Sequence, residues 1–263
     1  MLRRTLFLPA AVLLTAAALT AQQQPPTLTH VGVFQVKPGK GRDYLNLVRK
    51  YEQPVLDKLK AEGTVVAWGV DVPVYHRQGG ASHSVWWTVP NYAALEKVAS
   101  ARREVQQKMT AAELQEFFGL TEPDKHLDFL FRTSAGKSRA APAGTLPYTR
   151  IILNRVQPGK ADEYRQVWEK YFKPVYERLL ADGSVLAYSL EQEAQYSMEP
   201  EWRWTVVTLP NLAALDKVTA AFDAEDERRS PQERSMLTGQ LSSTTVPGTR
   251  RDFLLRALIY SER

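Results

Sequence analysis

Cysteine is absent from the 263 residues of the chain. Its absence excludes disulfide bonds, thiolate metal sites, a cysteine nucleophile and a lipoprotein anchor. Long apolar runs are also scarce, because only the run from Leu6 to Leu19 is nearly unbroken. A basic block is missing too, since 34 Lys and Arg are interspersed with 29 Asp and Glu, for a formal charge of +5. That distribution is typical of a solvated surface and predicts no nucleic-acid partner.

The motifs of common catalytic and cofactor sites are missing as well. There is no Gly-rich dinucleotide fingerprint and no strand-turn-helix serine motif. Lys40 and Lys160 follow Pro-Gly pairs but lack the other residues of a phosphate-binding loop, so we expect helix-entry turns there. The four histidines do not have the spacing of metal ligands, which predicts no metal site. The sequence therefore names no catalytic residue and leaves open whether the protein is an enzyme.

The first 21 residues are typical of a secretory signal peptide. Arg3 and Arg4 precede the apolar run, and small residues ending at Ala21 follow it. The run of roughly 14 residues is shorter than the ~20 needed to span a bilayer, although a retained anchor is the alternative. We expect cleavage near Ala21 and a secreted or periplasmic protein without a stable membrane span. Residues 22–27 would form a short N-terminal extension.

The rest of the chain contains an internal repeat with an offset of 120 residues. Between positions 29–98 and 149–218, 23 of 70 residues are identical without a gap, whereas unrelated sequences would match at roughly one position in sixteen. With an offset of 124, the Asp-Phe-Leu run at 128–130 also matches the run at 252–254. We infer a tandem duplication, with units at 28–133 and 148–263. Between them, 134–147 is rich in Ser, Ala, Gly and Pro and is predicted to be a linker.

Both units show the same order of elements: strand, helix, strand, strand, helix, strand. The strands are predicted at 30–37, 65–75, 82–89 and 126–133 in the first unit, and at 150–157, 185–196, 201–209 and 250–259 in the second. Pro54 and Pro174 should interrupt the first helix of each unit, because proline has no amide proton for the helix. Helix-start signals recur as capping asparagines and capping boxes, at Asn91, Asn211, Thr110 and Ser230. The fold class is therefore α+β, with two tandem ferredoxin-like (βαββαβ) units.

Several of these features together resemble one known superfamily. They are the strand that ends in Val-x-Pro-Gly-Lys at 36–40 and 156–160, the helix with its tyrosine and mid-helix proline, and Trp168. The pattern is similar to the dimeric α+β barrel superfamily, which includes antibiotic-biosynthesis monooxygenases, the NIPSNAP group, haem-degrading monooxygenases and chlorite-dismutase-like proteins. The resemblance implies an intramolecular, pseudo-dimeric α+β barrel, in which each unit covers the bare sheet face of the other. Homo-oligomers are compatible with it.

Tryptophans cluster on the third strand of each unit. Trp86 and Trp204 share strand parity and would face a barrel lumen, where they could stack on a flat apolar ligand. Plain core packing is the alternative.

The last strands carry charged residues on one face and apolar residues on the other. Asp128 and Arg132, like Asp252 and Arg256, would face the lumen and bind a polar ligand, or else form structural ion pairs. The other face, with Phe129 and its neighbours, should then pack under the helices.

The histidines all lie in the first unit. His30, His83 and His126 align with arginines of the second unit, and His76 aligns with Tyr196. His30 and His126 are candidate ligand-binding residues, and a haem axial ligand is one interpretation. The alternative is that these are strand-end positions where His and Arg are interchangeable.

Three functional hypotheses follow from these patterns. The first is an exported barrel that binds a small molecule, with a cofactor-independent monooxygenase-like activity as its catalytic form. The second is a haem-binding or haem-dependent protein, and otherwise no cofactor is predicted. The third is a non-catalytic scaffold module, whose barrel would be filled by side chains.

Overall fold

The computed structural model describes residues 26–76, 80–195 and 200–261. The expected signal peptide therefore lies outside the described residues. The first half of the chain contains four strands and four α-helices with one π-helical segment: β1 (Leu28–Val36), α1 (Gly41–Leu47), η1 (Val48–Glu52), α2 (Gln53–Ala61), β2 (Ala67–Pro73), β3 (His83–Val89), α3 (Tyr92–Lys108), α4 (Ala111–Gly119) and β4 (Thr121–Ser138).

The second half has its strands and helices in the same order as the first. Its elements are β5 (Tyr148–Arg155), α5 (Ala161–Tyr171), α6 (Lys173–Ala181), β6 (Ala187–Gln195), β7 (Trp202–Leu209), α7 (Ala214–Arg228), α8 (Pro231–Thr244) and β8 (Arg251–Tyr260). The strand order is also equivalent, with β4-β1-β3-β2 in one half and β8-β5-β7-β6 in the other.

The two four-stranded sheets close into one antiparallel barrel of eight strands. Two seams join the halves, because β2 pairs with β8 and β4 pairs with β6. Each half thus uses the other to pair both of its edge strands, which would otherwise expose unpaired backbone groups. The expected α+β barrel within one chain is confirmed by this closure.

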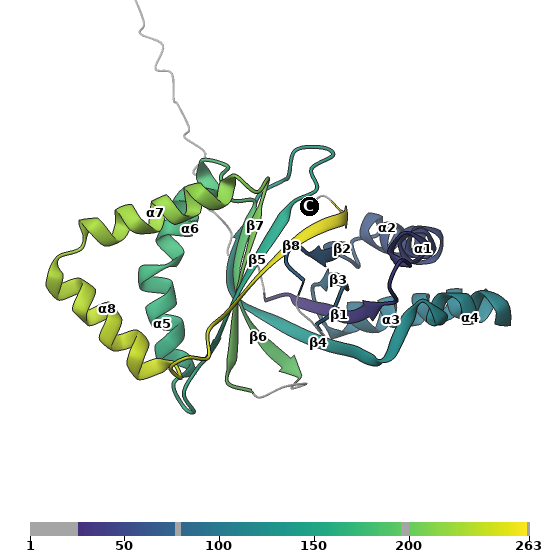
Figure 1. Ribbon diagram of the computed structural model, residues 1–263, viewed down its shortest axis with the longest axis horizontal. Coiled ribbons are helices and arrows are strands. Elements are labelled where there is room, and N and C mark those ends of the chain that lie inside the picture. Colours follow the sequence, from purple (N-terminus) through teal and green to yellow (C-terminus); the bar gives the residue numbers. More distant parts are fainter. Residues whose placement is uncertain (1–25, 77–79, 196–199, 262–263) are drawn as a thin grey trace, which may run out of the picture.

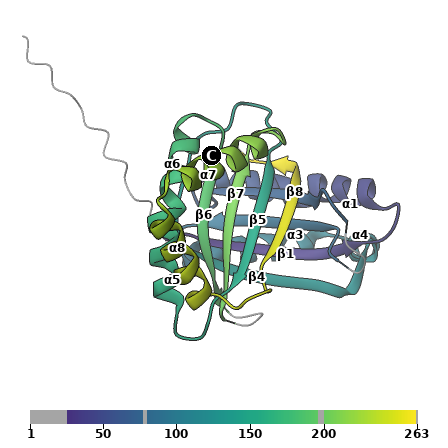
Figure 2. The same ribbon diagram turned by 60° about the vertical axis from the view of Figure 1, so that its left-hand side comes forward.

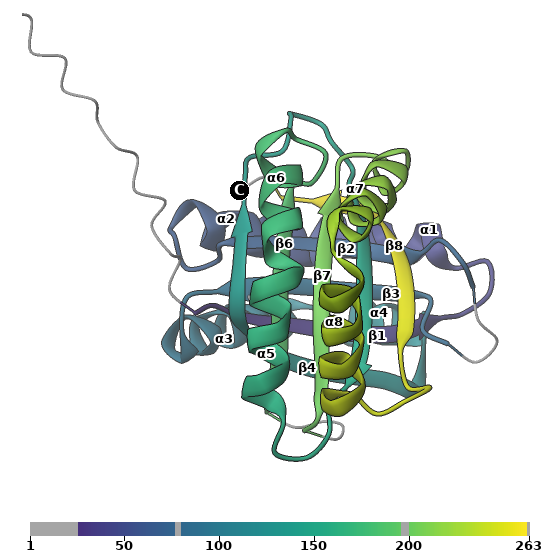
Figure 3. The same cartoon turned by 90° about the vertical axis from the view of Figure 1, so that its left-hand side faces the viewer.

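All the helices lie outside the barrel. In Figure 1 the helices α5 to α8 lie at one end of the molecule and α1 to α4 at the other, with the strands between them. Figure 2 shows β6, β7, β5 and β8 side by side in front of the strands of the first half. In Figure 3, α5 and α8 cover the outer face of the second sheet, and the strands of the two halves cross steeply.

Each half has its own apolar core between its sheet and its helices. The first core contains Trp68, Trp87 and Val98, and the second contains Trp168, Tyr188 and Val218. The inner faces of the sheets face one another across the barrel, and most of the side chains on them do not belong to these two cores. In the described part of the chain, no helix is long and apolar enough to cross a membrane.

The prolines interrupt the first helix of each half, as predicted. In the first half the helix passes through the π-helical turn η1 directly before Pro54, and in the second half it breaks at Phe172 before Pro174. The predicted capping boxes at Thr110 and Ser230 are both formed, with Glu113 and Glu233 as the reciprocal partners.

The turn before each first helix contains a glycine with positive φ. Gly39 and Gly159 have φ values of 77° and 78°, a backbone conformation that other residues rarely adopt. These turns let Lys40 and Lys160 enter the helices, where each side chain pairs with an acid three residues later, Asp43 or Glu163. The two lysines therefore belong to helix-entry turns.

Strand β4 is longer than the sequence pattern suggests. It begins at Thr121 and continues through Ser138, five residues into the segment predicted as a linker. Its end pairs with β6, from Ala135 opposite Leu190 to Ser138 opposite Ala187. The pairing extends because this part of β4 forms the seam between the halves, which a pattern of small residues does not reveal.

Candidate functional site: the barrel lumen

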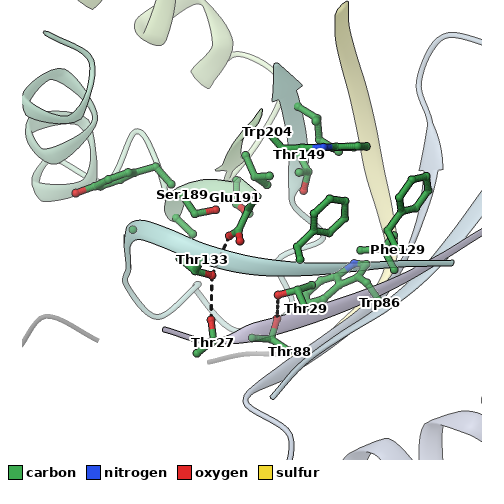
Figure 4. A pocket seen from close by; sticks show the side chains of 18 of the residues that line it. Thr27, Thr29, Trp86, Thr88, Phe129, Thr133, Thr149, Ser189, Glu191 and Trp204 are labelled. Atoms are coloured by element: carbon green, nitrogen blue, oxygen red, sulfur yellow. Dashed lines mark hydrogen bonds between the residues drawn. The ribbon is translucent and has the colours of Figure 1, made fainter. Parts of the chain in front are cut away.

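The barrel encloses a cavity of about 470 Å³ between the inner faces of its two sheets. Cavities that bind small molecules have volumes of about 300–1,000 Å³, so this one has the size of a ligand site. Figure 4 shows its lining, with aromatic rings and hydroxyl groups directed inward from strands of both halves. Aromatic side chains that line the cavity are Trp86, Phe129, Phe131, Tyr188, Trp204 and Tyr260.

Many cavity-lining positions occur in pairs that are 120 residues apart. Such pairs are Thr29 and Thr149, Val31 and Ile151, Asp71 and Glu191, Ser84 and Trp204, Trp86 and Val206, and Thr88 and Thr208. The two halves therefore present equivalent backbone positions to the lumen. The tryptophans are not at equivalent positions, because Trp86 corresponds to Val206 and Trp204 corresponds to Ser84. The side chains of the lumen therefore do not follow the twofold symmetry of the backbone.

Asp71 is the most unusual group of the lumen. It is a carboxyl group with 5% of its surface exposed, and it lines the cavity from β2. The indole Nε1–H of Trp86 donates a hydrogen bond of 2.8 Å to Oδ2 of Asp71. Burial raises the pKa of Asp71 to about 7, although the Trp86 hydrogen bond opposes the shift. Asp71 can therefore hold or release a proton near neutral pH.

Gly69 makes the contact between Trp86 and Asp71 sterically feasible. A Cβ atom at Gly69 would lie 2.8 Å from the Trp86 ring and 2.7 Å from the carbonyl oxygen of Ile259. Only a residue without a side chain lets the indole lie across β2 and reach the carboxyl two residues further along the strand.

Glu191 is the counterpart of Asp71 on the opposite half. It is buried, and its Oε1 accepts a hydrogen bond of 3.0 Å from the Thr133 hydroxyl. That threonine also shares a hydrogen bond with Thr27, and Thr29 shares one with Thr88 (Figure 4). One side of the lumen is thus a network of hydroxyl groups that ends at a carboxyl group.

Aromatic side chains lie next to this network, since Trp204 on β7 pairs with Glu191 on β6. The ring of Trp204 lies 4.7 Å from that of Phe131 and 5.6 Å from that of Phe129, centroid to centroid. Among the described residues, the buried Nε1–H of Trp204 has no hydrogen-bond acceptor. An unsatisfied buried donor is unfavourable by about 1–3 kcal/mol, so an acceptor on a ligand would stabilise this site.

Comparisons with solved structures place this architecture among known α+β barrels. A candidate monooxygenase from Fusobacterium nucleatum superposes with a TM-score of 0.64 at 11% identity, over 90% of this chain and 94% of that protein. Another candidate monooxygenase, from Lactobacillus acidophilus, gives a TM-score of 0.57 at 11% identity, over 89% and 98%. An anthrone oxidase-like protein gives 0.51 at 12% identity, over 90% and 93%.

The chain shares the dimeric α+β barrel fold with these proteins. At such low identity, the likeness describes the fold and not the chemistry. No protein-family model matches the sequence. No curated protein matches it either.

The structure places the two predicted tryptophans in the lumen. Trp86 and Trp204 both line the cavity, one from each half. Their shared strand parity was the signal that located them.

The charged residues of the last strands face the other way, so the prediction for these strands was wrong. Phe129 and Phe131 line the cavity, whereas Asp128 and Arg132 lie on the outer face of β4. The register explains the inversion, because Phe129 pairs with Val31 and directly paired residues share a face. The alternation of apolar and charged residues assigns them to the two faces of β4, but it does not by itself identify the face that lines the lumen.

Asp252 and Arg256 also lie outside the cavity. Asp252 accepts hydrogen bonds from Arg150 at 3.4 Å and from Arg250 at 3.2 Å. Arg256 is exposed. Leu255, between them in the strand, lines the cavity instead.

His30 and His126 both contact Asp128 on the outer face of the first sheet. Each Nε2 lies 3.2 Å from Oδ1 of that carboxylate, and the His30 ring stacks on Trp87 at 4.1 Å. The hydrogen bond from His30 is the largest cause that lowers the pKa of Asp128. In the second half, Arg150 and Arg250 make the equivalent contacts to Asp252. The two histidines and the two arginines thus have the same structural role.

The other two histidines also lie outside the lumen. His83 packs against Phe34 and Tyr44, and burial lowers its pKa to about 4. His76 is exposed. None of the four lines the cavity, and the described residues contain no cluster of three potential metal ligands. The lumen therefore does not fit a haem with a histidine axial ligand.

Asp71 and Glu191 were not among the predicted site residues. A signal for them exists in the sequence, because an acid recurs at the same repeat position in both halves, and in the first half the strand around it is otherwise apolar. A buried acid at an equivalent position in two copies is better explained by a lumen than by a solvated surface.

Proposed function

We propose that this protein binds a flat, largely apolar small molecule in the lumen of its barrel. The observation that carries the proposal is the cavity of about 470 Å³, which has an aromatic wall, a hydroxyl network and a buried carboxyl group. Aromatic walls with few polar groups are typical of sites that orient a planar ligand.

The catalytic form of this proposal is a cofactor-independent, monooxygenase-like reaction. Its support is the fold shared with two candidate monooxygenases and an ionisable group inside the cavity. In such a reaction the ligand itself is the reductant: O2 oxidises one of its CH2 groups to a carbonyl, and the second oxygen atom leaves as water. After incubation in air, mass spectrometry of the recovered ligand should then show the gain of one oxygen atom and the loss of two hydrogen atoms. Recovery of the ligand unchanged would contradict the catalytic form and leave the binding proposal standing.

The other two hypotheses receive less support from the geometry. A scaffold module predicts a barrel filled by side chains, and the cavity removes the main reason for it. Haem binding lacks a histidine in the lumen, so no feature of the site favours it over a ligand that needs no metal.

We also infer that the two halves arose by tandem duplication of one ferredoxin-like unit. The repeated positions in the lumen and the equivalent strand orders support this origin. A duplicated unit closes the barrel within one chain.

Export is a further part of the proposal, supported by the basic and apolar residues at the start of the chain. Expression of the full chain in a bacterium should yield a mature protein that begins near residue 22. N-terminal sequencing checks this, and a mature protein that retains residues 1–21 would contradict it.

Binding is tested with a panel of flat aromatic compounds and a Trp86→Ala/Trp204→Ala double variant. Ligand-induced shifts in Tm, each measured against the same variant without ligand, should be lost in the double variant. We expect affinity to fall at least about tenfold, because both stacking surfaces are removed. The Tyr75→Ala variant, which truncates a ring that is 77% exposed, serves as the matched control and should bind normally. Equal binding by the double variant and the unaltered protein would refute the proposal.

A further inference from the structure

The carboxyl group of Asp71 has no cationic partner among the residues that the structure describes. Its one hydrogen bond comes from the neutral indole of Trp86, to Oδ2, and Oδ1 makes none. No charged group contributes to the shift of its pKa, which burial dominates. A buried carboxylate without an opposite charge is unfavourable, and a cation that reached it would remove much of that cost.

The neighbours of Asp71 leave the side toward the cavity open to such a cation. Its paired residues are Ser84 on β3 and Ala257 on β8, and both are uncharged. Charged residues that line the same cavity are Glu191, Lys137 and Lys173. Lys137 pairs with Glu177 at 2.7 Å, outside the cavity lining. Lys173 lies on α6, in the half of the chain opposite β2.

The lining around Asp71 suits an organic cation better than a metal ion. Trp86 places an aromatic ring directly beside the carboxyl group, and Tyr260 lies 6.1 Å from that ring, centroid to centroid. Aromatic faces attract ammonium groups, and the attraction is strongest for indole in a site shielded from water. The carboxyl group lies at the Nε1–H edge of the indole, so a protonated amine bound to Asp71 would lie among aromatic side chains that can hold its ring system.

We propose that the lumen selects ligands that carry a protonated amine on a flat ring system, with the ammonium group at Asp71 and the ring against the aromatic lining. This inference rests on the proposed function, since it names the class of ligand that the same cavity takes.

The pH dependence of binding follows from the charge of Asp71. With a pKa of about 7, the carboxyl group is mostly protonated below neutral pH and can then offer only a hydrogen bond. The affinity for an amine should therefore rise with pH through this range and level off above it, as long as the amine stays protonated. A neutral ligand of the same shape should lack this rise.

The experiment compares three probes that share a naphthalene ring and differ in charge. They are 2-(2-naphthyl)ethylamine, 2-(2-naphthyl)ethanol and 2-naphthylacetate, titrated into the full-length mature protein by calorimetry at pH 6 and pH 8. At pH 8 we expect the amine to bind at least about tenfold more tightly than the alcohol, and the carboxylate to bind most weakly. At pH 6 the advantage of the amine over the alcohol should shrink.

Two variants assign the effect to Asp71. In Asp71→Asn, which keeps an acceptor for Trp86, the amine should lose about tenfold in affinity at pH 8 while the alcohol changes little. Asp223→Asn, which changes an exposed carboxylate on α7 outside the cavity, is the matched control and should retain the preference for the amine. If Asp71→Asn does not fold, the unaltered protein tests the site by itself. The ratio of its affinity for the amine to its affinity for the alcohol should be larger at pH 8 than at pH 6, and an equal ratio at the two pH values would contradict the site.

The outcomes separate this inference from the proposed function. If no naphthalene probe binds, both fail. If the probes bind with equal affinity, if the amine preference is independent of pH, or if it survives Asp71→Asn, the cavity binds flat molecules but the assignment of an ammonium site is overturned.

Discussion

At the scale of single residues, Asp71 should make the stability of the protein depend on pH. Its pKa rises from 3.8 to about 7 on folding, so between these values the folded protein binds more protons than the unfolded chain. The contribution of Asp71 to the free energy of unfolding is therefore present below about pH 4. It decreases as the pH rises from about 4 to about 7, and above that range it does not change further. The size is of the order of 2–4 kcal/mol for a shift of this magnitude.

The Asp71→Asn substitution removes that dependence. At each pH we compare the free energy of unfolding of the variant with that of the unaltered protein. We expect this difference to be more favourable to the variant at pH 8 than at pH 4.5, by about 2–4 kcal/mol. Urea denaturation at both pH values measures the difference. Asp223→Asn, which changes an exposed carboxylate on α7, should leave the profile unaltered. Parallel profiles for Asp71→Asn and the unaltered protein would show that Asp71 ionises normally in the fold.

At the scale of elements, the buried ion pair between η1 and α3 should stabilise the first half. Arg102 donates two hydrogen bonds to Glu52, at 2.7 and 2.9 Å, and its guanidinium group lies over the Trp87 ring at 4.7 Å. Glu52 is buried, so it depends on this partner. Arg102→Met, which keeps most of the apolar contact, should lower the free energy of unfolding by about 2–4 kcal/mol.

The double variant Glu52→Gln/Arg102→Met tests whether the loss comes from the stranded charge. It should recover much of the stability, because no buried carboxylate then lacks a partner. Arg103→Met, at an exposed position on the same helix, is the control and should cost little. Thermal or urea denaturation measures all three, and an equal loss in the single and double variants would mean that packing, not charge, dominates. The second half supports this expectation, since its equivalent positions hold Phe172 and Phe222, whose rings lie 6.0 Å apart.

At the scale of the whole molecule, neither half should form a stable monomer alone. Each sheet has two edges that pair only with the other half and an inner face that lines the lumen. A fragment of residues 26–138 would expose both the edges and that face to water. We expect it to dimerise or to remain unfolded, as measured by light scattering and circular dichroism. A folded, monomeric fragment would contradict the dependence of one half on the other.

The elements of the fold could largely be predicted from the sequence, because they depend on short-range chemistry. The capping boxes at Thr110 and Ser230 form where the pattern places them, since a hydroxyl and a carboxylate three residues apart satisfy each other's backbone groups. The helices break next to Pro54 and Pro174, because proline cannot donate a hydrogen bond. The repeat placed equivalent strands in both halves.

The face of β4 that lines the lumen could not be predicted in the same way. Phe129 and Asp128 are neighbours that point to opposite faces, and the alternation of apolar and charged residues does not say which face lines the lumen. Only the pairing with β1 decides which of them points inward, and that register depends on residues about 100 positions away.

The sequence by itself thus determined the helices, the strands and their repetition, because caps, prolines and apolar periods act over a few residues. The tertiary structure alone decided which side chains share the cavity. Asp71, Trp86, Glu191 and Trp204 come from four strands of a closed barrel, and their meeting depends on strand order and register. The raised pKa of Asp71 also depends on the tertiary structure. It results from the burial of a carboxyl group away from water, and no local sequence pattern encodes that environment.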